Sequence, residues 1–334
     1  MVSGGPTIRD VAQLAEVSLG SISNYLNDRK PVSANVRARI EAAIEQVGFI
    51  PNDAARIMRG ARSHAIGFVI PDAGNPFLIE VARGIEDVAI AAGYVVVSCN
   101  TDGDPSREDH YARALSEMRV AGAVVMAAST TENHLRTMEA SGAAVVVIGS
   151  GDHGSSFPTI EIDNVHGGFL AADHLIKKGH RDIVFMGGPG AAPQIDDRFA
   201  GCLRAVREAG LDDSVLRRVD AAGNSTQARV AASEVVADRM PRPTAAICAN
   251  DLLALALEST LLRRGVRVPE QFAITGYDDI EAAVLAPVPL TTVRQPQYEL
   301  GRRAAEFVLD LAEGRAPVET GHEFMAELIV RSST

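Results

Sequence analysis

The decisive stretch of the sequence is TIRDVAQLAEVSLGSISNYLN, residues 7–27. Its first apolar positions repeat at the spacing of one helix face: Ile8, Val11, Ala12 and Ala15. Thr7, with Asp10 three residues on, forms a typical N-cap pairing, and Ser18 can cap a second helix after a short break. Two short helices joined by a tight turn predict a helix-turn-helix, although an ordinary helical hairpin has the same spacing.

The following residues predict a third helix on the same small core. Ser33 can cap it, Gly48 can end it, and its apolar positions are Val36, Ile40, Ala43, Ile44 and Val47. A short polar helical patch follows at residues 53–60. The run TIRDVAQLAEVS…SISNYLN…VSANVRARIEAAIEQVGFIPNDAARIMRG resembles the headpiece of the lactose/galactose repressor family, without a gap. The family's core can be followed over the rest of the chain.

Beyond residue 63, β-rich runs alternate with amphipathic helices. The runs include AIGFVIP, YVVVSCN, GAVVMAA, AAVVVIG, DIVFMGG, AAICAN and QFAITGYDD. Helices are expected at residues 76–92, 105–119, 131–141, 165–178, 195–209, 225–240 and 251–264. This alternation predicts parallel sheets covered on both faces, and about four crossover units on each side of residue 164 predict two Rossmann-like lobes. The resemblance implies a periplasmic-binding-protein-like α/β core in which the chain crosses back at residues 290–296.

These patterns divide the chain into three parts. We expect an all-α helix-turn-helix DNA-binding domain at residues 1–50, a hinge helix and linker at 51–62, and an effector-binding and dimerisation core at 63–334. Lobe one would comprise about 63–163 and 294–322, and lobe two about 164–293 and 323–330. Ligands of open α/β sheets bind beyond the carboxyl ends of the strands, so the cleft between the lobes is the expected effector site.

Charge and composition limit the classes of function. The net charge is +2 over residues 1–62 and −13 beyond them, so DNA contact should be confined to a mildly basic head that needs dimerisation. No apolar run reaches membrane-spanning length, and the N-terminus has no secretory pattern. The widely spaced Cys99, Cys202 and Cys248 indicate buried thiols of a reducing compartment. We therefore expect a cytoplasmic protein without a membrane partner or a metal site.

The family resemblance assigns DNA contacts to head and hinge positions. Hydroxyls at helix starts suit phosphate contact, whereas the second helix would face base edges. The residues assigned are Thr7, Ser18, Leu19, Gly20, Ser23, Asn24, Asn27, Ser33, Asn52, Ala55 and Met58. Asn24 can bond bidentately to adenine, where many relatives have arginine, so we expect a different half-site.

Two further departures from the family concern Glu16 and Met58. Glu16 stands in the turn where the family often has glycine, and we expect a small loss of affinity without loss of fold. Met58 takes the hinge position usually filled by leucine, which wedges between base pairs; alternatively it packs only against the partner hinge helix. The hinge is too short to form an isolated helix and should order on DNA. Effector binding would then change lobe closure and shift operator affinity.

The effector site is predicted from residues at strand ends and from the family resemblance. The predicted contacts are Phe77, Ser129, Arg198, Asn250, Asp278 and Gln295. Arg198 can form paired hydrogen bonds to adjacent hydroxyls or a carboxylate, and an amide beside a carboxylate suits sugar hydroxyls. Phe77 could instead be a core residue at a helix start, and Asp251 and Asp279 could be plain helix caps. Many relatives carry an aspartate at the position of Gly149, so a polar anchor is missing there.

Two rival classes are less consistent with the sequence. A periplasmic binding protein would need a signal peptide and no headpiece. A nucleotide-dependent enzyme would rest on the glycines near residue 188, which lack the GxGxxG spacing, and we find no GxSxG, HExxH or GxxxxGK[ST] motif. The prediction is therefore a non-enzymatic, homodimeric transcriptional repressor without a cofactor. It would bind a palindromic double-stranded operator under control of a small molecule, with a sugar or sugar derivative expected.

Overall fold

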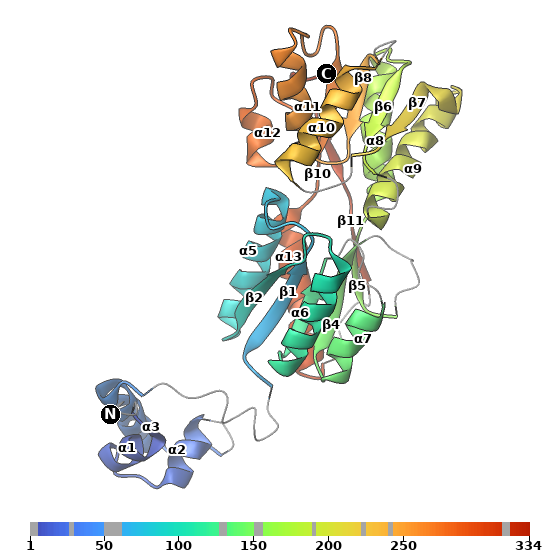
Figure 1. Cartoon of the computed structure of the whole chain (residues 1–334). Helices are drawn as coiled ribbons and strands as arrows, with labels where there is room; N and C mark the ends of the chain where they lie inside the picture. The colour runs from blue at the N-terminus through green and yellow to red at the C-terminus, as the bar shows by residue number, and fades with distance from the viewer. Residues whose placement is uncertain are drawn as a thin grey trace. The chain divides into compact units, whose positions relative to one another are not determined.

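The computed structural model describes residues 6–26, 30–49, 62–126, 132–149, 156–188, 192–221, 225–239, 243–315 and 321–334. The chain divides into two compact units, Met1–Ser63 and His64–Thr334, which we call the head and the core. Both are drawn in Figure 1. None of the helices in the described ranges is long and apolar enough to span a lipid bilayer.

The head is a bundle of the three expected helices: α1 (Ile8–Leu14), α2 (Leu19–Leu26) and α3 (Ala34–Val47). Their buried apolar residues form one small core: Val11, Ala12, Ala15, Ile22, Ile40 and Ala43. Gly48 ends α3 in the left-handed region at φ 63°, which glycine adopts without the steric penalty of a Cβ. The predicted helix-turn-helix is confirmed, whereas the predicted hinge helix at residues 53–60 lies outside the described residues.

The first lobe of the core is built on a six-stranded parallel sheet. Its strands are β1 (Ala65–Ile70), β2 (Val95–Asn100), β3 (Gly122–Val125), β4 (Ala144–Gly149), β5 (Thr159–Ile162) and β11 (Gly321–Phe324), in the order β11-β5-β4-β3-β1-β2. Helices α5 (Pro76–Ala91) and α13 (Gln297–Ala312) pack together on one face. Helices α6 (Pro105–Glu117) and α7 (Glu132–Ala140) cover the other face, over a separate apolar cluster.

The second lobe repeats this layout. Its strands are β6 (Ile183–Met186), β7 (Leu216–Val219), β8 (Ala245–Cys248), β9 (Ala273–Asp278), β10 (Thr291–Arg294) and β12 (Glu327–Ile329), in the order β12-β10-β9-β8-β6-β7. Among the described strands of this sheet, β12 alone is antiparallel to its neighbour. The helices are α8 (Asn164–Lys177), α9 (Pro193–Glu208), α10 (Thr226–Ala237), α11 (Asp251–Arg263) and α12 (Glu281–Leu285), with a 3-10 turn at Asp213–Val215. Helix α8 packs on α9, and α10 packs on α11.

The chain passes between the lobes three times in the core. It does so between β5 and α8, between β10 and α13, and between β11 and β12. The two-lobed parallel α/β architecture is therefore confirmed. Residues 290–296, expected only as a crossover, contain β10, which is a full member of the second sheet.

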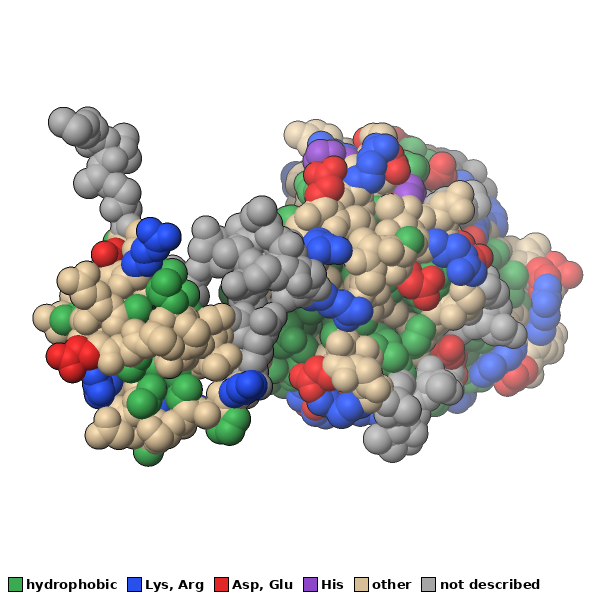
Figure 2. Space-filling view, turned by 90° about the horizontal axis from the view of Figure 1, so that it is seen from below, with side chains coloured by type: hydrophobic (Ala, Val, Ile, Leu, Met, Phe, Trp, Pro, Cys, Tyr) green, Lys and Arg blue, Asp and Glu red, His purple; other side chains and the backbone are tan. Residues whose placement is uncertain are grey.

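The surface charges of the two units are mixed. Figure 2 shows acidic and basic side chains interspersed over the visible face of the core, and a few acidic and basic groups on the visible face of the head. The excess of acid in the core is therefore not gathered into a single patch on this face.

Candidate nucleic-acid interface and interlobe site

Five of the predicted DNA-contacting residues are Ser18, which directly precedes helix α2, and four residues of the helix itself. Leu19, Gly20, Ser23 and Asn24 form two pairs four residues apart, so they share one side of the helix. Leu19 is 46% exposed although it is apolar, whereas Ile22 is fully buried beneath it. The Ser18 Oγ accepts a hydrogen bond from the Ser21 amide at 3.0 Å and caps the helix. The helix thus offers an accessible, mostly small and polar surface.

Thr7 and Ser33 stand at the N-termini of α1 and α3. The Thr7 amide and hydroxyl both donate to Asp10 Oδ2, at 2.7 and 2.8 Å, which lowers the pKa of Asp10. Because the Thr7 hydroxyl proton is already donated, contact with a phosphate through this group requires that bond to be exchanged. The Ser33 Oγ accepts from the Val36 amide at 3.4 Å.

The structure explains how Glu16 is accommodated where the family often has glycine. Its backbone lies in the left-handed region at φ 48°, which costs a residue with a Cβ about 1–2 kcal/mol. The Arg39 Nη2 donates to both the carbonyl and the carboxylate of Glu16, each at 3.0 Å. The expectation that Glu16 leaves the fold intact agrees with this contact. The ion pair also engages one of the few basic side chains of the head.

Asp278 is the centre of the polar contacts between the lobes. It ends β9 with φ 110° and is 3% exposed. Its Oδ1 accepts from Gln295 Nε2 at 2.8 Å, and its Oδ2 accepts from Asn75 Nδ2 of the first lobe at 3.4 Å. Burial raises the pKa of Asp278 to about 6, and the Arg198 guanidinium opposes this shift. We call Asn75, Phe77, Arg198, Asp278 and Gln295 the interlobe site.

Arg198 is positioned by the close packing of α8 on α9. A Cβ at Gly168 would lie 1.9 Å from the Arg198 carbonyl oxygen, so only glycine permits this approach. The Arg198 Nε donates to Asn164 Oδ1 at 2.9 Å, and Nη1 donates to the Ala249 carbonyl at 2.6 Å. The guanidinium carbon lies 3.6 Å from the centroid of the Tyr277 ring. The cation is therefore rigidly presented, which favours selective binding over adaptable contact.

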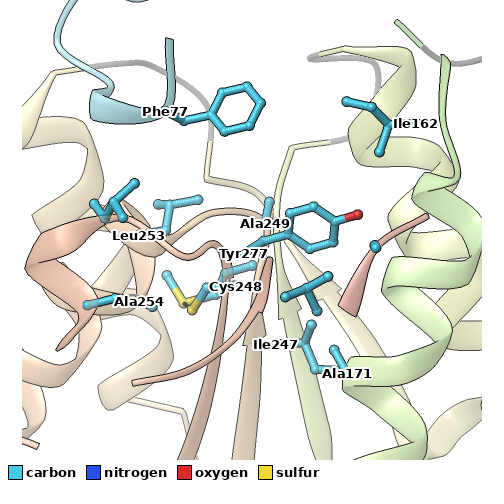
Figure 3. Close-up of a cluster of buried hydrophobic side chains, with 14 of the residues drawn as sticks. Phe77, Ile162, Ala171, Ile247, Cys248, Ala249, Leu253, Ala254 and Tyr277 are labelled. Atoms are coloured by element: carbon cyan, nitrogen blue, oxygen red, sulfur yellow. Dashed lines mark hydrogen bonds between the residues drawn. The ribbon is translucent and has the colours of Figure 1, made fainter. Parts of the chain in front are cut away.

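Gln295 and Phe77 complete the interlobe site. Gln295 is fully buried, and within the described ranges its Oε1 has no hydrogen-bond partner. Such a group commonly faces a ligand or an ordered water. Phe77 is 5% exposed and belongs to an apolar cluster that also contains Tyr277 and Ala249 of the second lobe. Figure 3 shows its ring extending from the start of α5 toward these residues.

Three other strand-end residues have structural partners. The Asn250 side chain caps α11 by accepting from the Leu253 amide at 2.9 Å, so one of its two polar atoms is already bound. Asp251 is buried and accepts from Thr292 Oγ1 at 2.6 Å and from the Ile280 amide at 2.9 Å. The Asp279 carboxylate binds Arg294 and Arg331. Asp251 and Asp279 thus connect separate elements, rather than cap their own helices as the alternative interpretation held.

The remaining predicted contacts are Asn27, Asn52, Ala55, Met58 and Ser129, and all five lie outside the described residues.

Three polar residues that were not predicted from the sequence also lie in or near the interlobe site. Asn75 and Asn164 each stand at the start of a helix after a strand, which is the signal by which they could have been found. The Gln194 Nε2 lies 3.7 Å from the point that a Cβ at residue 149 would occupy. Gln194 therefore approaches the position where many relatives carry an aspartate and this chain has Gly149.

Comparisons with known proteins assign the head and the core to known families of domains. Residues 7–52 match the model for bacterial regulatory proteins of the lacI family, and residues 172–334 match the periplasmic binding protein-like domain. The HTH-type transcriptional repressor PurR of Aliivibrio fischeri is 33% identical over 331 residues, covering 98% of both chains. The PurR of Photobacterium profundum is 31% identical over 328 residues, with the same coverage.

Solved structures show the same likeness. The lac repressor dimer bound to operator and the anti-inducer ONPF is 25% identical, with a TM-score of 0.82 and 99% of each chain covered. The complex of the regulator CelR with cellobiose is 27% identical, with a TM-score of 0.72, over 98% of this chain and 100% of that one. A regulator from Enterococcus faecium with bound ribose is 25% identical, with a TM-score of 0.74, over 81% of this chain and 98% of that one.

Proposed function

Because the chain belongs to the lacI family of bacterial regulatory proteins and is a DNA-binding repressor controlled by a small molecule, we propose that it acts as a homodimer whose effector is a sugar or sugar derivative. The observation that carries the effector class is the interlobe site. It combines a buried carboxylate, an amide whose oxygen has no hydrogen-bond partner among the described residues, a fixed guanidinium and an aromatic ring. Polar groups of this kind suit hydroxyls, and an aromatic face suits the apolar side of a sugar ring.

The proposal places the effector between the lobes, with contacts to both. Asn75 of the first lobe already bonds to Asp278 of the second, so a ligand that displaces or extends this contact changes the relation of the lobes. A difference in effector affinity between two lobe arrangements is sufficient to shift operator affinity. Two of the similar structures hold a sugar, which supports the same class here. Binding requires no chemical step, and we assign the protein to the cytoplasm because its operator lies there.

The dimer proposal is supported by exposed apolar residues on both lobes. In the first lobe these are Ile79, Ile90 and Val95, exposed by 52%, 69% and 61%. In the second lobe Val284 and Leu285 of α12 are exposed by 48% and 74%. Figure 1 places α5, β2 and α12 on the same side of the core. A symmetric pair of subunits joined there would bury them and would match a palindromic operator.

The dimer is tested by the molar mass of the full chain in solution. Leu285→Asp introduces a charge at an exposed position, and we expect it to shift the mass from dimer to monomer. Met118→Asp is the matched control, because Met118 is also exposed but lies outside these three elements, just past α6. A wild-type chain that is already monomeric at micromolar concentration overturns the dimer.

The effector class is tested with an operator recovered from a randomised DNA pool. Binding of that duplex is then measured with a panel of monosaccharides and disaccharides, and separately with nucleosides and amino acids. We expect one or more sugars to change operator affinity at least tenfold, and Asp278→Asn to abolish this response while DNA binding remains. A response confined to the non-carbohydrate compounds contradicts the proposal. The sign of the response distinguishes an inducer from a co-repressor.

A further inference from the structure

An ion pair joins the two lobes at a distance from the crossovers. Asp72 follows β1 of the first lobe, and Arg229 lies in the first turn of α10 in the second. The Arg229 Nη2 lies 2.7 Å from Asp72 Oδ2, with side chains only 12% and 16% exposed. In the first sheet β1 is three places from the crossover strand β5, and α10 follows β7, the edge strand farthest from β12. The pair therefore connects the lobes on the side away from their covalent links.

Asp72 also organises the loop between β1 and α5. Its Oδ1 accepts from the Gly74 amide at 2.9 Å, and its carbonyl accepts from the Asn75 amide at 3.1 Å. The neighbouring Ala73 amide donates to Asn100 Oδ1 at 3.1 Å. The Asx turn built by Asp72 thus fixes the direction in which the loop leaves β1.

This loop leads directly into the interlobe site. The Asn75 Oδ1 accepts from the Phe77 amide at 3.0 Å, while its Nδ2 donates to Asp278. A continuous series of hydrogen bonds therefore runs from Arg229 through Asp72 to the two first-lobe residues of the site. Because the ion pair is largely shielded from water, removing one partner leaves the other charge poorly solvated.

We propose that Arg229 is a positioning residue of the effector site. Its guanidinium holds the Asp72 carboxylate, and through it the β1–α5 loop, against the second lobe, so that Asn75 and Phe77 are kept where the effector binds. Arg229 itself acts through Asp72 and not on the effector. The importance of this role for regulation rests on the proposed function. The restraint of the β1–α5 loop by Arg229 does not depend on that function, and it is measured without any effector.

The test is hydrogen–deuterium exchange of the full-length protein, read at the amides of Ala73, Gly74, Asn75 and Phe77. We expect Arg229→Ala to raise their exchange rate about tenfold, because opening of the loop then no longer breaks the ion pair. Arg229→Lys should recover part of the protection through a single contact. Arg217→Ala is the matched control, since it removes an ion pair with Asp182 inside the second lobe and should leave residues 73–77 unchanged.

A double-mutant cycle separates this role from a general loss of stability. Asp72→Asn keeps the oxygen that accepts from Gly74 but removes the charge, so the double variant with Arg229→Ala should exchange no faster than the faster single variant. An unchanged rate in Arg229→Ala, or two single effects that multiply in the double variant, overturns the proposal. Failure of every sugar in the panel would overturn the proposed effector class, and the exchange result would still decide the role of Arg229.

Discussion

Asp251 should make the free energy of unfolding of the core depend on pH near neutrality, where most carboxyl groups are fully ionised and do not titrate. Burial, reinforced by the nearby Asp278 carboxylate, raises the pKa of Asp251 to about 8, from 3.8 in the unfolded chain. The folded state therefore holds this proton more tightly than the unfolded state. This contribution to the free energy of unfolding is fully present below the unfolded pKa of 3.8. It decreases as the pH rises between the two pKa values, and it is lost once the pH has passed about 8. Over pH 6.5–8.5 the loss integrates to about 2 kcal/mol.

Replacing Asp251 by Asn tests this reasoning. The amide imitates the protonated acid, since it keeps one oxygen acceptor and adds a donor that the Thr292 hydroxyl can receive. We expect the free energy of unfolding, measured with urea and circular dichroism, to fall by about 2 kcal/mol less in Asp251→Asn than in the wild type over pH 6.5–8.5. Comparison of the two proteins cancels the other groups that titrate in this range.

The matched control is Asp213→Asn. Asp213 is exposed, and its hydrogen bond from Arg207 lowers its pKa, so its removal should leave the wild-type slope between pH 6.5 and 8.5. If Asp251→Asn keeps the wild-type slope to within about 0.5 kcal/mol, Asp251 is ionised throughout the range and the argument from burial is refuted.

Three further predictions concern recognition. Asn24→Ala should relax the preference at one base pair of the selected operator by about 1–3 kcal/mol, whereas uniform weakening over all sequences would reduce Asn24 to a non-specific contact. Glu16→Gly should raise the affinity for random duplex DNA about threefold at low salt, measured by fluorescence anisotropy, because it removes a carboxylate and the ion pair that this carboxylate forms with Arg39. An unchanged affinity would show that Glu16 does not weaken DNA binding. Gly149→Asp should alter which sugars act on operator binding. It should change the free energy of unfolding by no more than about 0.5 kcal/mol, because the new Cβ meets Gln194 at ordinary contact distance. An unaltered sugar profile would count against a ligand role at this position.

The head could be predicted closely because its signals are local. The capping pair of Thr7 and Asp10, the Ser33 cap and the left-handed Gly48 lie beside the helices that they delimit. The φ of Glu16 could not be predicted in this way, because a residue with a Cβ takes the left-handed region only when a partner such as Arg39, distant in sequence, favours it.

In the core, the apolar content of each strand decided what could be predicted. The apolar runs at β1, β4 and β9 were clear, but β7 reads Leu-Arg-Arg-Val and β5 reads Thr-Ile-Glu-Ile, too short and polar for periodicity to separate from loop. Pairing with β4 and β11, or with β6, makes them strands. The crossover of the chain back to the first lobe was predicted from the family resemblance alone.

For the candidate site, position at a strand end was a useful but incomplete guide. It selected Asp278 and Arg198, which the fold brings into one region with Gln295. It did not reveal that the Asn250 oxygen is engaged as a helix cap, or that Asn75 reaches across the lobes, because both depend on where a side chain turns in three dimensions.

The order of strands also bears on how the protein is made. Helix α13 and strand β11 belong to the first lobe, yet they follow nearly all of the second lobe in the sequence. A chain emerging from the ribosome therefore leaves the part of one face over β3 and β4, and one edge of its first sheet, uncovered until α13 and β11 have been synthesised. The unfinished sheet presents apolar residues such as Val124 and Ile148, which are fully or almost fully buried in the complete protein. Newly made chains should consequently be accessible to chaperones between the synthesis of β5 and that of α13, and truncation before β11 should remove an edge strand from each lobe at once.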